Sequence, residues 1–236
     1  IQVTPDDFLC LLFSPVASVY FLLIHRGVDG KYDPKQGAAI VLPEVTDLED
    51  YSYAYTRYLS TPAKRLFASS LGDAGLTAML VLNTAADTGP MQELNVDGCK
   101  AITMGTVGWA KQQKTRTGVV GIYDLDIDFL NQFSTAMTAF PNKPKESKGG
   151  GVFFATSVCR GHIADNLAEK KPWFSDFFNL MRSSKRAQLV AFERRELADM
   201  VENAQWTHEA DQFLVSAVHT ALRKRYGMLA ARAHKQ

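Results

Sequence analysis

A short segment of the chain combines the side chains that proteins use to contact nucleic acids. Residues 109–116 contain one tryptophan, three cations and two glutamines. Lysine and arginine neutralise phosphates, glutamine bonds to phosphate, sugar or base edges, and an indole ring can stack on a base. The alternative is a polar surface loop whose indole packs inward. We predict a nucleic-acid contact made by Trp109, Lys111, Gln112, Gln113, Lys114 and Arg116.

A second set of candidates lies in the later part of the chain, before and after the aromatic pair Trp173 and Phe174. Helix capping and solvation explain each of these polar residues equally well. Several aligned cations would instead form a track for a phosphate backbone. The candidates for nucleic-acid binding in this part are Arg160, Asn166, Lys170, Lys171, Arg182, Lys185 and Arg186.

The sequence lacks the short motifs that are typical of enzymes. It has no glycine-rich dinucleotide or phosphate loop, no HExxH pair and no GxSxG nucleophile. Asp124, Asp126 and Asp128 alternate like the start of a calcium loop, but the glycine and the distal glutamate of such a loop are missing. We expect these aspartates to cap a helix or shape a turn. A metal-dependent nuclease built on them is the weaker alternative, and we predict no enzyme activity, no cofactor and no metal.

Composition and charge narrow the class of protein further. Hydrophobic residues make up 46% of the 236 residues, which argues against a disordered chain. The apolar stretch 8–24 is interrupted by Ser14, Pro15 and Ser18, so we expect no membrane span. Three isolated cysteines fit a reducing compartment, and we expect a cytoplasmic protein.

The charge is distributed unevenly along the chain. Residues 1–130 hold 10 Lys and Arg against 15 Asp and Glu, whereas residues 131–236 hold 16 against 10. This asymmetry indicates that the second half of the chain binds a polyanion and that the first half binds a different kind of partner. Solvated helix faces explain it equally well.

The elements that must position these residues follow from the hydrophobic pattern. The segment 111–116 lies between two β-favouring runs, so it is predicted to form the tip of a hairpin. Asp47 is a plausible N-cap for the helix that follows it. The expected strands cover residues 17–24, 38–42, 100–110 and 117–125, and the expected helices cover 47–59 and 126–140. Residues 71–82 are expected to form a third apolar helix or a buried segment.

The second half of the chain has a different sequence pattern, with a polar segment followed by mostly helical periodicity. Residues 141–151, with three lysines, two prolines and three glycines in a row, predict a flexible basic loop or linker. A strand-like run follows at 151–157, and the pattern is helical from Gly161 onward, with apolar faces over 187–204 and 213–226. We predict an α+β fold: a mixed α/β portion at 1–150, taken as a fragment of a larger N-terminal domain, and a C-terminal helical bundle at 151–236.

These segments together resemble a known family. Residues 105–116 are similar to a "G-T-V-x-W-x-K-Q-Q-K-x-R" segment, and residues 160–174 to an "R-G-x-I-A-D-N-L … K-P-W-[FY]" pattern. Residues 42–48 also fit. The chain thereby resembles the large subunit of type I CRISPR Cascade complexes, in the subgroup of myxobacterial-type and transposon-associated systems.

The resemblance implies a non-catalytic subunit of an RNA-guided DNA surveillance complex. Such a subunit helps to recognise the protospacer-adjacent motif, contacts the 5′ handle of the guide RNA and stabilises target DNA. The implied partners are CRISPR guide RNA, target double-stranded DNA, the backbone and handle-binding Cascade subunits and, for the transposon-associated subgroup, transposition proteins. A nuclease and a purely structural module that binds protein remain the alternatives.

Overall fold

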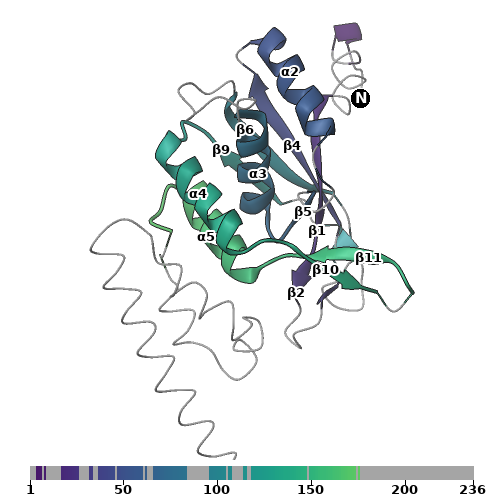
Figure 1. Cartoon of the computed structure of the whole chain (residues 1–236). Coiled ribbons are helices and arrows are strands. Elements are labelled where there is room, and N and C mark those ends of the chain that lie inside the picture. The colour runs from purple at the N-terminus through teal and green to yellow at the C-terminus, as the bar shows by residue number, and fades with distance from the viewer. Residues whose placement is uncertain are drawn as a thin grey trace, which may run out of the picture.

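A computed structural model gives the arrangement of most of the first three quarters of the chain (Figure 1). It describes residues 4–6, 8, 17–26, 32–33, 37–45, 47–60, 62, 66–83, 96–104, 106–107, 114–115, 118–147, 149–173 and 175.

A five-stranded sheet forms the centre of this part, in the order β5-β1-β4-β6-β9. Strand β5 runs parallel to β1, and each of the other neighbouring pairs is antiparallel. The strands are β1 (Val19–Leu23), β4 (Ala38–Val45), β5 (Phe67–Ala68), β6 (Val96–Met104) and β9 (Val119–Ile122).

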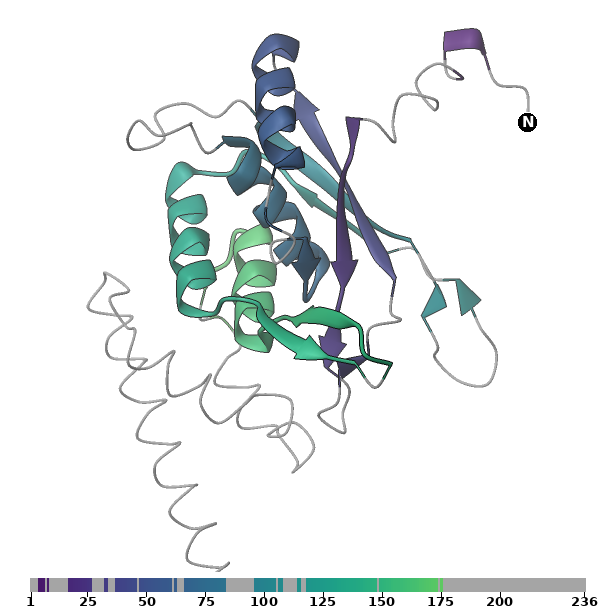
Figure 2. The ribbon, with the colours of Figure 1, turned by 45° about the vertical axis from the view of Figure 1, so that its right-hand side comes forward.

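The alternation along β1 shows which face of the sheet carries the core. Val19, Phe21 and Leu23 are buried, whereas Tyr20 and Leu22 are 37% and 51% exposed. The period of two is what a sheet with one covered face requires. The helices lie on one side of the sheet (Figure 2), and these three residues belong to the core that the sheet shares with them.

Three of the helices in the described part begin after an N-cap residue that the sequence makes recognisable. Asp47 accepts hydrogen bonds from the backbone N–H of Glu49 and Asp50, and Ser157 caps the last helix in the same way. Carboxylate and hydroxyl oxygens at this position satisfy the unpaired N–H groups of the first turn. The helices are α2 (Leu48–Leu59), α3 (Leu71–Asn83), α4 (Ile127–Ala139) and α5 (Val158–Ala168).

Helix α2 protects part of one edge of β1. Strand β5 pairs only with Leu22 and Leu23, so the edge before them needs other partners. The Tyr58 hydroxyl accepts from the Tyr20 N–H at 3.0 Å and lies 3.3 Å from the Tyr20 carbonyl oxygen, to which it also donates. The Tyr51 hydroxyl donates to the carbonyl of Ala17, and burial raises the pKa of Tyr51 to about 12, so this donor keeps its proton. Side chains thus replace a strand along this edge.

Two short hairpins extend the sheet at one of its ends. Strand β7 (Thr106–Val107) pairs antiparallel with β8 (Lys114–Thr115), directly between β6 and β9. Strand β2 (His25–Arg26) pairs with β3 (Tyr32–Asp33) between β1 and β4.

The expectation of a flexible basic loop or linker at 141–151 is wrong for residues 143–146, which form a strand. Strand β10 (Lys143–Glu146) pairs antiparallel with β11 (Val152–Ala155) over four residue pairs. The polar run has little apolar area of its own, but the apolar strand β11 supplies a partner. Pro144 is compatible with this edge position because an edge strand leaves every second N–H unpaired.

The α+β class and the expected helices and strands of residues 17–140 are confirmed in outline. Helix α5 packs into the same core as the sheet, through the buried Ile163, Ala164 and Leu167. The helical bundle expected at 187–204 and 213–226 lies outside the described residues, and the division of the chain at residue 150 stays a prediction. Within the described part, no helix is long and apolar enough to cross a membrane.

Candidate nucleic-acid interface

The β7–β8 hairpin carries the first group of predicted contact residues. Thr106 pairs with Thr115 and Val107 pairs with Lys114, so the predicted hairpin is present. Lys114 lies in strand β8 rather than in the connection. In Figure 2 the pair projects beyond the end of the sheet, away from the helices. The other predicted contacts, Trp109, Lys111, Gln112, Gln113 and Arg116, lie outside the described residues.

The base of this hairpin is held by a backbone and side-chain exchange between β6 and the start of β9. The N–H of Thr103 donates to the carbonyl of Gly118 at 2.9 Å, and the N–H of Gly118 donates back to Thr103 Oγ1. The base of the hairpin is therefore anchored directly in the central sheet.

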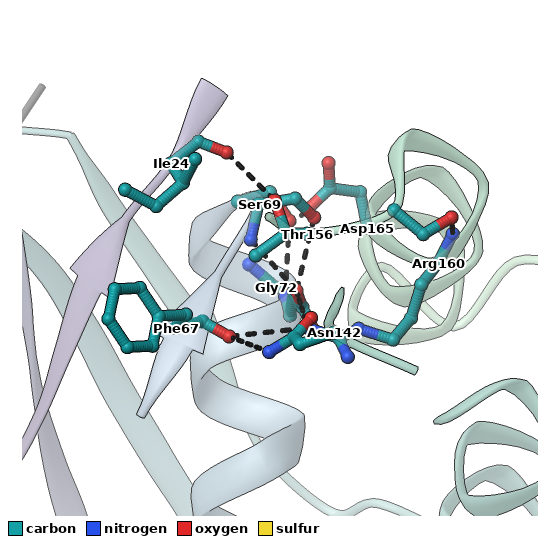
Figure 3. Close-up of polar contacts among 11 residues, drawn as sticks. Ile24, Phe67, Ser69, Gly72, Asn142, Thr156, Arg160 and Asp165 are labelled. Carbon is teal, nitrogen blue, oxygen red and sulfur yellow. Dashed lines mark hydrogen bonds and ion pairs between the residues drawn. The ribbon is translucent and has the colours of Figure 1, made fainter. Parts of the chain in front are cut away.

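The Arg160 side chain is buried and bonded within the fold instead of lying open on the surface. Its side chain is only 3% exposed, and its Nη2 atom lies 2.8 Å from Asp73 Oδ2. The same nitrogen donates to the carbonyl oxygen of Phe67 at 3.3 Å (Figure 3). Asp73 Oδ2 also accepts from the backbone N–H and the hydroxyl of Ser69, at 2.8 and 3.1 Å. The guanidinium thus joins α5 to the start of α3 and to β5.

Glycines allow α3 and α5 to approach each other closely. A Cβ atom at Gly72 would lie 2.5 Å from Asp165 Oδ1, and one at Gly161 would overlap the hydroxyl of Ser69. The N–H of Gly72 donates to Asp165 Oδ1 at 3.2 Å. Burial raises the pKa of Asp165 from 3.8 to about 6, partly offset by hydrogen bonds from Ser70 and Gly72.

Asn166 is also engaged in the fold. It is 6% exposed, and its Nδ2 atom donates to the carbonyl oxygens of Trp173 and Ser175, each at 2.9 Å. His162 Nε2 lies 2.8 Å from the same Ser175 oxygen. The segment after α5 is thereby folded back onto the helix, with the Trp173 ring buried. His162, Asn166 and Trp173 of the motif at 160–174 thus take part in this packing.

Among the described residues of the second candidate set, Lys170 and Lys171 lie at the surface. Their side chains are half exposed, and they lie near the carboxylates of Asp124 and Glu169, respectively. Lys170 adopts φ +55, which ends helix α5. Arg182, Lys185 and Arg186 lie outside the described residues.

The three aspartates of the alternative nuclease reading lie at the entry to α4. Asp126 is the N-cap, and its side chain accepts from the N–H of Asp128 at 3.1 Å. This is the capping role that the sequence predicts. Among the described residues, no group of three His, Cys, Asp or Glu side chains is placed to hold a metal ion.

Sequence reasoning missed Asp73, the partner of Arg160. The available signal was a single carboxylate inside the otherwise apolar stretch 71–82. A buried charge of this kind needs a partner of opposite sign. The sequence offered many cations, so it did not identify Arg160 as that partner.

Comparison with known proteins identifies a relative. No protein-family model matches the chain. The chain is similar to the CRISPR-associated protein Cas8a1/Csx13 of Myxococcus xanthus (strain DK1622). The two are 26% identical over 242 residues, which cover 96% of this chain. The chain spans about 40% of the length of this relative. The similarity supports the expected resemblance to Cascade large subunits.

Proposed function

We propose that this chain is part of the non-catalytic large subunit of a CRISPR RNA-guided DNA surveillance complex. The similarity to Cas8a1/Csx13 along 96% of the chain is the observation that carries the proposal. In such a complex the guide RNA reads the target sequence by base pairing, and protein contacts read a short duplex motif. The partners would be guide RNA, target duplex DNA and other Cascade subunits.

Within this function, we assign a nucleic-acid contact to the β7–β8 hairpin. The pair is anchored in the sheet by Thr103 and Gly118, and its connection, residues 108–113, contains the tryptophan, one of the lysines and both glutamines. The cations Lys111, Lys114 and Arg116 would hold phosphates, whereas a glutamine can pair with adenine in a major groove. Recognition of the protospacer-adjacent motif and contact with the guide handle are the two roles open to this hairpin.

Replacement of the three cations tests this assignment. The variant Lys111→Ala/Lys114→Ala/Arg116→Ala is assembled into the complex, and its affinity for duplex targets with different motif sequences is measured at two salt concentrations. The affinity should fall for all targets, and the loss should shrink as salt rises. Single Gln112→Ala and Gln113→Ala variants should include one that alters the ranking of motifs, by roughly 1–3 kcal/mol if it removes a bidentate base contact.

The matched control is Lys100→Ala, which removes an exposed lysine from β6 within the same sheet. An assembled triple variant that binds every target as tightly as the parent would contradict the hairpin assignment. A parent chain that copurifies with neither small RNA nor repeated protein subunits would contradict the proposed function itself.

A further inference from the structure

The β10–β11 hairpin is an ordered ribbon fixed to the end of the central sheet. The Phe154 ring packs on the Phe67 ring with centroids 5.4 Å apart, and Thr156 Oγ1 donates to the carbonyl of Ile24 at 2.8 Å. At the other end, the N–H of Ser147 donates to the Gly151 carbonyl at 2.7 Å, which closes the turn. Figure 1 shows the ribbon extending past the sheet.

The two faces of this ribbon differ in charge. Paired residues share a face and alternate along each strand. Lys143 and Lys145 therefore lie on one face, whereas Pro144 lies on the other together with its partner Phe154, which contacts the sheet. All four residues of β10 are exposed. Among the described residues, neither lysine has an ion-pair partner, so this face presents two cations to solvent.

This ribbon leaves the sheet at the same end as the β7–β8 hairpin. Ala38 of β4 pairs with Leu22 of β1 on one side and with Met104 of β6 on the other, so β1 and β6 finish at the same end of the sheet, with the start of β4 between them. The β10–β11 hairpin is tied to Ile24, directly after β1, and β7 follows Met104. Figure 2 shows both hairpins projecting at this end.

We propose that the Lys143/Lys145 face of the β10–β11 ribbon binds the phosphate backbone of duplex DNA. This inference rests on the proposed function and adds a second, separate contact surface to it. Two exposed cations on one face complement a polyanion, and the major groove of B-form DNA is wide enough for a two-stranded ribbon. The deep, narrow major groove of A-form RNA does not admit one, so the ribbon selects duplex DNA.

The test is the salt dependence of DNA binding by the assembled complex. The variant Lys143→Gln/Lys145→Gln keeps side-chain length and removes both charges from residues that are exposed. Each lost phosphate contact reduces the magnitude of the slope of log affinity against log salt by about 0.9. The magnitude of the slope should therefore be smaller by about 1.8 in the double variant. At about 0.1 M salt this corresponds to up to about 60-fold weaker binding, which vanishes toward 1 M. The loss should be the same for matched and mismatched duplexes.

The double variant is compared with Lys100→Gln, which removes an exposed lysine from strand β6 and should leave the slope unchanged. A double variant with the slope of the parent, in a complex that still binds duplex DNA, overturns this inference and leaves the proposed function standing. An equal loss of affinity for duplex RNA overturns the choice of duplex DNA. A parent complex without affinity for duplex DNA overturns the proposed function.

Discussion

Arg160 and Asp73 form a buried ion pair across 87 residues of sequence, with 2.8 Å between Nη2 and Oδ2. Neither side chain is more than 3% exposed. The pair connects α5 to the first turn of α3, and the Asp73 carboxylate also holds Ser69. A desolvated pair of this kind costs much when one partner is lost, because the other charge stays buried without compensation.

The first prediction concerns this pair. Asp73→Asn keeps an acceptor for Ser69 but leaves the guanidinium of Arg160 without its counter-charge. We expect the free energy of unfolding to fall by about 3–5 kcal/mol, as measured by urea denaturation. The control is Glu169→Gln, which removes the exposed partner of Lys171 and should change little. Equal stability of the two variants would show that the buried pair is not important for folding.

Close contact between α3 and α5 gives the second prediction. Gly72→Ala places a Cβ atom 2.5 Å from Asp165 Oδ1 and 3.0 Å from the Asp165 Cα, so the helices must separate. Overpacking of this kind costs about 1–3 kcal/mol. Gly149→Ala, in the β10–β11 turn, meets no atom within 4 Å and should be close to neutral. Thermal unfolding of both variants provides the measurement, and a neutral Gly72→Ala would contradict the close packing.

Asp165 provides the third prediction, on pH dependence. Burial raises its pKa from 3.8 to about 6, so the native chain takes up this proton more readily than the unfolded chain. The stability that Asp165 contributes is full below about pH 4 and is lost as pH rises through about 6. Asp165→Asn should match the parent near pH 4 and exceed it by up to about 3 kcal/mol at pH 7.5.

Urea denaturation of both proteins across this range is the measurement, and the exposed Asp97→Asn is the control. Other titrating groups cancel in the difference between variant and parent. A difference that is constant with pH, or that grows as pH falls, would refute the raised pKa.

Absence of DNA cleavage by the chain is the fourth prediction. Asp126 caps α4 in the parent, and an asparagine caps a helix equally well, so Asp126→Asn separates chemistry from folding. The complex, without any separate nuclease, is incubated with target DNA and Mg²⁺ or Mn²⁺. We expect intact DNA with both proteins. Cleavage by the parent that disappears in Asp126→Asn would establish the nuclease alternative.

Local sequence signals predicted much of the fold. Asp47 and Asp126 are recognisable N-caps, and the alternation in β1 and the apolar run of α3 have the expected periods. The β10–β11 hairpin was missed because the four residues of β10 are all exposed, so no apolar alternation marks it as a strand. Its pairing depends on β11 and on an anchor at Phe67, which is distant in sequence.

The candidate site could be predicted only in part: the hairpin was predicted, but the structural roles of Arg160 and Asn166 were not. The hairpin at 106–115 follows from β-favouring runs around a polar segment, and β7–β8 pairing is local. Arg160 and Asn166 carry side chains typical of nucleic-acid contacts, yet their hydrogen bonds are made within the chain. Residue type alone does not separate these uses, because the partners of Arg160 are Asp73 and Phe67, about ninety residues earlier.

The tyrosine hydroxyls along β1 have a consequence for behaviour at high concentration. A strand edge with free N–H and carbonyl groups is a template for a strand from another molecule, and such additions lead to aggregates. At Tyr20 both groups are already bonded to Tyr58, and the Tyr51 hydroxyl holds the carbonyl of Ala17. Helix α2 therefore blocks intermolecular strand addition at this edge, although it contributes no strand to the sheet.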